Sequence, residues 1–508
     1  MNKTKKLFYN TLILTGTSFL MRTVGVSFNV YLSNKIGAAG IGLFQLIMTV
    51  YSLAITVGAA GVRLSSTRLV VEEAGLGQKG GFAIMRRCIA YGLMLGLFAA
   101  LLLFFGADMA SMHWIDDVRA APSLRILAFS LPFISMSAAM NGYFTATREI
   151  PQYSFVQIAE QTVKLVTIVV SLNILKDPSI ETACIALVGA TTFSEIVSFL
   201  LSYALYLRMK RKSAHHASAP GHIWKKIVRI AVPDGVGSTV RSVLVTVEQL
   251  LIPLGFRKSG SSEEASLATY GTIHGMVLPI VLYPSAILSS LAGLLIPELA
   301  ECNAQQNRER IMTITTRVMH LTLLFSLGTA GILYAFADKL SLAIYNDLLS
   351  AQYIRVLAPL VPVMYLDMTV DGILKGMDQQ LQSMRYNIYD AALCVALVYY
   401  LLPRYAVKGY IFIVFVSEVF NFFLSVNRLI KVTQVKLNIL GSMGKPLGCI
   451  LGALLSVHIF FSATAGRIHP TAELVLLIGA TVFFYFIYLY LCGCITQQDI
   501  KWMRRVVA

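Results

Sequence analysis

The sequence predicts an all-α polytopic membrane protein with about fourteen transmembrane helices. Three observations support this prediction: 56% of the 508 residues are hydrophobic, only 13% are charged, and apolar runs follow one another along the whole chain. Soluble domains carry about 25% charged residues, and a helix needs about 20 apolar residues to cross a bilayer. Almost the entire chain is therefore expected to lie in a membrane.

The apolar runs are centred near residues 20, 53, 95, 134, 165, 195, 241, 283, 325, 362, 394, 418, 453 and 481. The first run follows Lys3, Lys5 and Lys6 and has no signal-peptide cleavage site, so it is expected to remain as a helix. The longest polar stretch, "RMKRKSAHHASAP" at 208–220, is too small to fold alone. The external loops are also too short for a catalytic domain, and the chain is not expected to be an enzyme.

Basic residues predict the orientation of the chain. If both termini lie on one side, the segments of that side hold 25 lysines and arginines, and the opposite loops hold 11. Because cytoplasmic loops are enriched in lysine and arginine, both termini are expected to be cytoplasmic. The net charge of +16 thus follows the membrane pattern, and no nucleic-acid-binding motif accompanies it.

An internal repeat divides the chain. One constant offset aligns "RILAFSLPFISMSAAMNGYF" (125–144) with "RVLAPLVPVMYLDMTVDGIL" (355–374) without a gap. Helices 1–6 in an N-terminal lobe (1–207) are therefore expected to repeat as helices 7–12 in a C-terminal lobe (224–436). A cytoplasmic linker (208–223) joins them, and helices 13 and 14 with the tail occupy 437–508. Since six is even, the two lobes share one topology, an arrangement that transporters use.

Six basic residues fall inside the predicted spans, where a charge costs about 3 kcal/mol on insertion scales. They are Arg22, Arg63, Arg68, Lys164, Arg241 and Arg317. Arg22 and Arg241 occupy roughly equivalent places in the two repeats. They are expected to face a shared water-filled cavity and to bind an anionic substrate there. The alternative is a structural ion pair, such as Arg241 with Glu248.

The other candidates for substrate binding are Arg63, Arg68, Lys164 and Glu160. Arg63 and Arg68 lie toward the cytoplasmic end of their helix, where they could instead reach the interface, and Arg68 could pair with Glu72 four residues on. Glu160 and Lys164 have the same i,i+4 spacing and are expected to bridge each other.

Acidic residues of the second lobe suggest a coupling site. Asp371 and Asp390, with Asn387 one turn before Asp390, could hold a sodium ion or a proton. The alternative is a solvated cavity wall formed by Asp367, Asp371 and Lys375 on one helix face. The seven cysteines are scattered and lack zinc-site spacing, so no metal site, and no cofactor beyond a coupling ion, is expected.

Three segments resemble a known family: "NTLILTGTSFLMRTVG" (10–25), "GAAGVRLSSTRLVVEEA" (58–74) and "NGYFTATREIPQYSFVQIAEQTVKL" (141–165). They are similar to the stage V sporulation protein B family. That family belongs to the polysaccharide-transporter branch of the multidrug/oligosaccharidyl-lipid/polysaccharide exporter superfamily, which includes the lipid II flippases. The resemblance covers essentially the whole chain. One departure is Arg63, where the family usually has an apolar or proline residue.

The resemblance implies two six-helix lobes around a V-shaped cavity and transport by alternating access. The implied substrate is an undecaprenyl-pyrophosphate-linked sugar precursor of the lipid II type, for peptidoglycan, spore cortex or polysaccharide assembly. The expected setting is a bacterial cytoplasmic membrane, with membrane lipids as partners, no nucleic acid and a monomeric chain. The alternative is a cation-coupled multidrug antiporter of the same superfamily, which would prefer an acidic cavity. The six basic residues in the spans favour the flippase.

Overall fold

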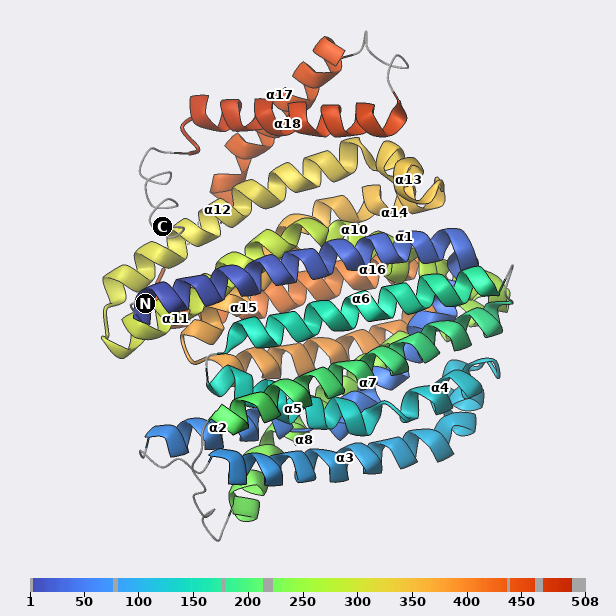
Figure 1. The fold of residues 1–508 in the computed structure, drawn as a ribbon. Coiled ribbons are helices and arrows are strands. Elements are labelled where there is room, and N and C mark those ends of the chain that lie inside the picture. The colour runs from blue at the N-terminus through green and yellow to red at the C-terminus, as the bar shows by residue number, and fades with distance from the viewer. Residues whose placement is uncertain are drawn as a thin grey trace. The chain divides into compact units, whose positions relative to one another are not determined.

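The structure is a computed structural model that describes residues 3–75, 81–147, 149–175, 179–212, 223–435, 439–461 and 469–495. Every regular element in these ranges is helical (Figure 1). The α-helices are α1 (Lys3–Gly58), α2 (Val62–Gly75), α3 (Gly81–Met109), α4 (Ala120–Ala128), α5 (Leu131–Ala146), α6 (Ile150–Ile174), α7 (Ile180–Lys212), α8 (Ile223–Lys258), α9 (Glu263–Tyr270), α10 (Leu278–Leu282), α11 (Ala286–Ala304), α12 (Arg308–Ala335), α13 (Ala337–Tyr345), α14 (Leu349–Leu357), α15 (Val361–Gly376), α16 (Gln380–Thr433), α17 (Ile439–Phe461) and α18 (Pro470–Leu491). Short π-helices η1 (Ala110–Ile115) and η2 (Gly271–Val277) and 3-10 helices η3 (Tyr283–Ser285) and η4 (Ala358–Leu360) lie between them. The predicted fold class is confirmed.

Two helices are too long to be single membrane spans. α1 has 56 residues and α16 has 54, so at about 1.5 Å per residue each would be about 80 Å long, against a hydrocarbon core of about 30 Å. Non-helical backbone divides α1 at Gly37 (φ 68°, ψ 176°) and α16 at Ala406 (φ 47°, ψ −131°). Glycine adopts a positive φ without strain, whereas alanine rarely does. Each of these elements therefore contains two helices.

Within the described ranges, eleven helices are long and apolar enough to cross a membrane, or twelve if the bent pair α4 and α5 is one span. This pair bends by 46° between Ala128 and Leu131. The chain is a multi-pass membrane protein. The count of fourteen spans fits the division of α1 and α16 but stays a prediction.

Contacts group the chain into two compact units. Unit 1 comprises Met1–Gly271 and Val395–Ala406, and unit 2 comprises Thr272–Cys394 and Val407–Ala508. α8 and α9 belong to unit 1 because they pack on α1. Packing in one conformation does not test the boundaries of a sequence repeat, so the lobes 1–207 and 224–436 and the linker 208–223 stay predictions. Most of that linker lies outside the described residues.

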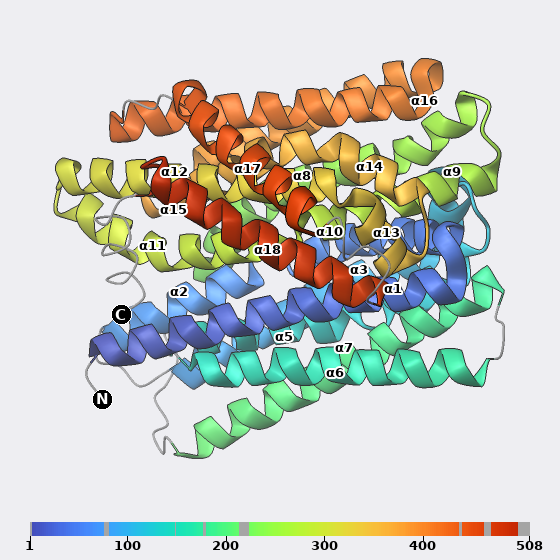
Figure 2. The same ribbon diagram turned by 90° about the horizontal axis from the view of Figure 1, so that it is seen from above.

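Unit 1 has a core of apolar and aromatic side chains from α2, α3, α5, α7 and the start of α8. Met85, Met140 and Phe144 are fully buried in it. Beside them the rings of Tyr143 and Tyr206 meet edge to face, 5.4 Å apart. α6 runs along α7 in both views (Figures 1 and 2) and completes this side of the unit.

Glycines allow α1 and α9 to touch through their backbones. A Cβ placed on Gly42 would lie 2.1 Å from the carbonyl oxygen of Leu267, and a Cβ on Gly271 would lie 2.1 Å from that of Ala38. Real Cβ atoms do not approach so closely, because close packing leaves no room for an added methyl group. The contact of α1 with α9 and with the first residue of η2, Gly271, therefore requires glycine at both positions.

An ionic network fixes the loop after η1 to the end of α8. Arg257 Nη1 donates to Asp116 Oδ2 at 2.6 Å, and Arg119 makes a two-pronged contact with Asp117, whose closest distance is 2.6 Å. Glu263 lies 3.6 Å from both guanidinium groups. The hydrogen bond from Arg119 to Asp117 raises the pKa of Arg119 above its ordinary value. The network ties the segment from 116 to 119 to the turn that joins α8 and α9.

Unit 2 is built around α11, α12 and α15, whose apolar faces share a buried cluster with Leu429 of α16. α17 and α18 pack on α12 beside this cluster. Tyr485 of α18 donates to the carbonyl of Leu324 at 2.8 Å, and its ring lies over Gly328. The two C-terminal helices are thus attached to unit 2 by a hydrogen bond as well as by apolar packing.

The structure repeats individual contacts at the offset that the sequence predicts. Arg125 pairs with Asp108 at 2.5 Å in unit 1, and Arg355 pairs with Asp338 at 2.7 Å in unit 2. Three more equivalences support the same offset. Asp116 and Asn346 both have a positive φ (59° and 53°); the hydroxyls of Ser111 and Ser341 bond the carbonyls of Asp117 and Asp347; and α5 and α15 begin at 131 and 361. The internal repeat is therefore a structural one.

Candidate functional site

Arg22 and Arg241 both lie in unit 1, on α1 and α8. Arg22 is half-buried and has an interaction partner. Arg241 is exposed and makes neither a hydrogen bond nor an ion pair with any described residue, so the alternative bridge to Glu248 does not form. α8 is one of the helices apolar enough to span a membrane. Arg241 therefore carries an unneutralised charge within a span.

Arg63 and Arg68 are exposed on α2. The guanidinium carbon of Arg63 lies 5.8 Å from the ring centre of Tyr153 on α6, in a cation–π arrangement. The alternative ion pair of Arg68 with Glu72 is absent among the described residues, and both side chains are exposed. Both arginines remain available to an anion, and their predicted contact with substrate stays a prediction.

A cluster of ionisable side chains joins α6 to α7 within unit 1. Glu160 Oε2 accepts a hydrogen bond from Ser198 Oγ at 2.6 Å. Lys164 on α6 interacts electrostatically with Glu195 on α7 and, more weakly, with Glu160. The predicted bridge between Glu160 and Lys164 is wrong, because in the described part of the chain no ion pair within 4.0 Å joins them. Glu160 reaches across to α7 instead of along its own helix.

Among the residues that the structure describes, Tyr51 on α1 is the other titratable group that interacts with this cluster. It is 1% exposed and interacts electrostatically with Glu195 and Glu160. Ser130 Oγ donates its proton to the carbonyl of Leu127 at 2.6 Å, so the 2.5 Å contact between Tyr51 and Ser130 has the tyrosine as donor. The phenol is therefore fixed beside the two carboxylates without bonding to either.

Unit 2 contains a second polar cluster, and it includes the three predicted coupling residues. Asp371 on α15 pairs with Lys375 at 2.6 Å and accepts from the hydroxyl of Ser383. Asn387 Nδ2 donates to the carbonyl of Ser383 at 2.9 Å. Asp371 and Asn387 are thus linked through one serine.

Asp390 and Asp367 complete this cluster. Asp390 accepts from Ser417 at 2.8 Å, and Asp367 Oδ2 accepts from Asn421 Nδ2 at 3.0 Å. The charges of Asp371 and Asp390 both act on Asp367. Asp367 Oδ1 and Asn421 Oδ1 are buried and have no hydrogen-bond partner. Among the described residues, no group of three or more histidine, cysteine, aspartate or glutamate side chains has the geometry to hold a metal ion.

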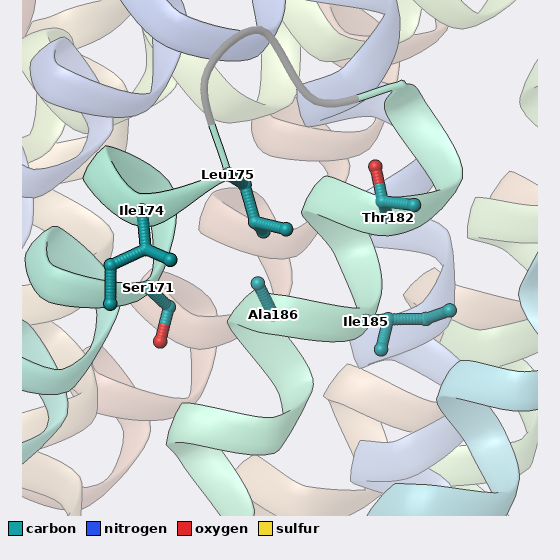
Figure 3. A pocket seen from close by; sticks show the side chains of 6 residues that line it. All are labelled: Ser171, Ile174, Leu175, Thr182, Ile185 and Ala186. Carbon is teal, nitrogen blue, oxygen red and sulfur yellow. The ribbon is translucent and has the colours of Figure 1, made fainter.

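Two cavities in unit 1 are apolar. The larger, of about 410 Å³, lies between the end of α6 and the start of α7 (Figure 3). It is lined by Ser171, Ile174, Leu175, Thr182, Ile185 and Ala186. The other, of about 210 Å³, lies between α1 and α3 and is also lined by Trp114 of η1. None of the predicted charged residues lines either cavity, so neither is suited to a phosphate group.

Sequence reasoning missed Glu195 and Asn421, and it gave Asp367 only a solvated role. A usable signal was present for Glu195, since an acidic residue inside the apolar run "TTFSEIVSFLL" (191–201) is costly unless it has a function. Asn421 carries no charge, and no sequence spacing relates it to Asp367. Only the packing of α16 against α15 brings these two side chains together.

Comparison with known proteins gives the family of this fold. A family model described as "Polysaccharide biosynthesis protein" matches residues 7–302, more than half of the chain, and a model described as "MatE" matches residues 262–401. Stage V sporulation protein B of Bacillus subtilis (strain 168) is 23% identical over 401 residues, which are 78% of this chain and 77% of that protein. Sporulation protein YkvU of the same strain is 17% identical over 397 residues, 77% of this chain and 87% of that protein. The predicted family resemblance is confirmed.

Solved structures share the fold. The lipid II flippase MurJ in an inward closed conformation superposes with a TM-score of 0.66 and 14% identity over 94% of this chain and 98% of that chain. An inward-facing multidrug resistance MATE family transporter has a TM-score of 0.61 and 16% identity over 84% of this chain and 96% of that chain. Because the model described as "Polysaccharide biosynthesis protein" matches more than half of its length, the chain belongs to the polysaccharide biosynthesis protein family.

Proposed function

We propose that this protein flips a lipid-linked sugar precursor across a bacterial cytoplasmic membrane by alternating access. The substrate is an undecaprenyl-pyrophosphate-linked saccharide of the lipid II type. The observation that carries the proposal is Arg241, an exposed guanidinium within an apolar span that no described side chain neutralises. The name of one solved structure with the same fold, a lipid II flippase, supports the same substrate class. The protein acts as a monomer with both termini in the cytoplasm and catalyses no reaction.

The proposed ligand of Arg241 is a pyrophosphate. A guanidinium stays charged at every physiological pH, and its planar fork matches two phosphate oxygens. Arg22, Arg63 and Arg68 lie in the same unit and add positive charge for an anionic headgroup. An anionic substrate compensates the free-energy cost of an arginine in the membrane. A cationic drug would increase that cost.

The direct test is rescue of cells depleted of their own lipid II flippase. We expect this chain to restore the appearance of lipid II on the outer face, measured by labelling of externalised precursor. The MatE match to residues 262–401 makes a cation-coupled multidrug antiporter the second candidate. Ethidium efflux from the same cells without lipid II externalisation would replace the flippase by the antiporter.

We also propose that a coupling sodium ion binds at the unpartnered oxygens of Asp367 and Asn421, within the polar cluster that also contains Asp371, Asn387 and Asp390. A buried polar atom without a partner requires an explanation, and an ion is one of the few. The unpartnered oxygens of Asp367 and Asn421 lie in this cluster. Hard cations prefer carboxylate and amide oxygens. A sodium ion would satisfy both oxygens and offset the excess of negative charge.

Asp367→Asn is expected to remove the effect of sodium on stability. An ion that binds only the folded protein raises its free energy of unfolding by about 2.7 kcal/mol at 100 times Kd. We expect sodium, compared with equal potassium, to raise the Tm of the purified wild-type protein but not that of Asp367→Asn. Asp378→Asn is the matched control, since Asp378 is exposed and its positive φ of 59° suits asparagine. An unchanged sodium response in Asp367→Asn would exclude this site.

A further inference from the structure

Unit 1 contains three interacting ionisable side chains whose charges do not cancel. Glu160 and Glu195 are acidic, and among the described residues Lys164 is the one basic group that interacts with both. We call these three residues the Glu160 cluster. If all three were ionised, the cluster would carry one net negative charge. Among the described residues, their electrostatic partners are one another and Tyr51 of α1.

The Glu160 cluster lies near the middle of its helices. Glu160 is ten residues into α6 and Glu195 fifteen residues into α7, which corresponds to about 15 and 22 Å along the axes. α6 and α7 are both membrane-spanning in length and composition. An uncompensated charge at such a depth costs several kcal/mol, so the extra negative charge needs a counter-charge.

Hydrogen bonds do not supply that counter-charge. Glu160 accepts from Ser198, a neutral donor, at 2.6 Å. The hydroxyl of Tyr51 donates its proton to Ser130 rather than to a carboxylate. In the described part of the chain, neither carboxylate has an ion pair to Lys164 within 4.0 Å. The ammonium group balances one of the two carboxylates at longer range, and the other stays unbalanced.

The internal repeat shows what the counter-charge could be. At the offset that aligns Arg125 with Arg355, Glu160 corresponds to Asp390 in the unit 2 cluster, and Lys164 corresponds to Cys394. The helices agree in register, since α6 begins at 150 and α16 at 380. At this position unit 1 therefore has an ammonium group and unit 2 has a cysteine, while the ammonium group of the unit 2 cluster, Lys375, pairs with Asp371. With the ammonium group of Lys164 present, the remaining charge to be balanced is one carboxylate, and a single proton is enough to balance it.

We propose that the Glu160 cluster is a proton-binding site, in which Glu160 and Glu195 share one exchangeable proton taken from water. Two carboxylates that share one site do not both ionise when a single nearby cation compensates them. Binding converts one carboxylate to a carboxylic acid and release restores it, with no other bond made or broken. This role replaces the substrate contact predicted for Glu160 and Lys164. Proton binding is independent of the proposed flippase function, while coupling of the proton to transport rests on it.

Infrared difference spectroscopy tests proton binding directly, because a carboxylic acid has a C=O stretching band that a carboxylate lacks. Purified full-length protein in proteoliposomes is titrated from neutral to alkaline pH. We expect a carboxylic-acid band in the wild-type protein that disappears on titration. Glu160→Gln and Glu195→Gln should each remove it, because Lys164 then balances the single remaining carboxylate. Glu264→Gln, an exposed carboxylate at the start of α9, is the control and should leave the band unchanged.

Lys164→Met gives the opposite change. Without the ammonium group both carboxylates should take up protons, so the acid band is expected to grow by about twofold. A wild-type spectrum without the band, survival of the band in both glutamine variants, or no growth in Lys164→Met would overturn the site. Coupling is read separately: transport by Glu195→Gln should lose its dependence on external pH. A protein that binds the proton but does not flip lipid II would contradict only the flippase.

Discussion

Arg241→Ala is expected to abolish transport of the lipid-linked precursor while the protein remains at its normal level in the membrane. Arg241 has no partner among the described residues, so its removal strands no carboxylate and relieves the cost of a charge in a span. Breaking a buried ion pair has the opposite effect and costs about 3 to 5 kcal/mol in soluble proteins. Transport and abundance together therefore separate a substrate contact from a structural one.

Arg241→Lys should retain part of the activity. An ammonium group still attracts a phosphate but cannot make the two parallel hydrogen bonds of a guanidinium. The measurement is lipid II externalisation against membrane abundance for both variants, with Arg404→Ala on an exposed position of α16 as control. Normal transport by Arg241→Ala would exclude the phosphate contact.

Arg22→Ala is the companion experiment, and the two arginines differ in their surroundings. Arg22 is half-buried and has a partner within the protein, whereas Arg241 is exposed. If Arg22 binds pyrophosphate, its alanine variant loses transport at unchanged abundance, and this is the result we expect. Lost abundance would instead assign Arg22 to a structural pair and leave Arg241 as the phosphate contact.

The helices and the repeat could be predicted because their signals are local or periodic. Apolar runs of about 20 residues identify spans whatever surrounds them. One offset aligned Arg125 with Arg355, and the structure adds Asp108 and Asp338 at the same offset as their partners. The break of α1 at Gly37 lies between the predicted apolar runs centred near residues 20 and 53, although its position was not predicted.

Side-chain partners across helices could not be predicted. The i,i+4 spacing places Glu160 and Lys164 on one helix face, but the bond forms to Ser198, 38 residues away. Asp367 likewise gains its partner Asn421 from a helix 54 residues away. Helical periodicity describes one helix at a time, and it carries no information on which neighbour offers the closer donor.

The assignment of α8 and α9 to unit 1 could not be predicted from the sequence either. A repeat indicates which helices are related by descent, while contacts depend on where small residues let backbones meet. Gly42 and Gly271 lie far apart in the sequence and supply one such place. The contact depends on the absence of side chains, which a hydropathy profile does not register.

Gly42→Ala is therefore expected to destabilise the protein strongly for a one-carbon change. The added Cβ would lie 2.1 Å from the carbonyl oxygen of Leu267 and 2.8 Å from its carbon. These are backbone atoms of α9, so relief requires the two helices to separate, and we expect a loss at or above the roughly 1–3 kcal/mol typical of overpacking. The measurement is the Tm of the purified protein together with its abundance in the membrane.

Gly25→Ala provides a control in the first of the two helices of α1, with the opposite expected sign. A Cβ at Gly25 would meet nothing within 4 Å, and alanine favours a helix over glycine by up to about 1 kcal/mol. Gly271→Ala should resemble Gly42→Ala, because its Cβ would lie 2.1 Å from the carbonyl oxygen of Ala38. Since either substitution forces the same two helices apart, the double variant should lose less stability than the sum of the two single losses. Strict additivity, or a Gly42→Ala protein as stable as Gly25→Ala, would show that α1 and α9 do not meet at these glycines.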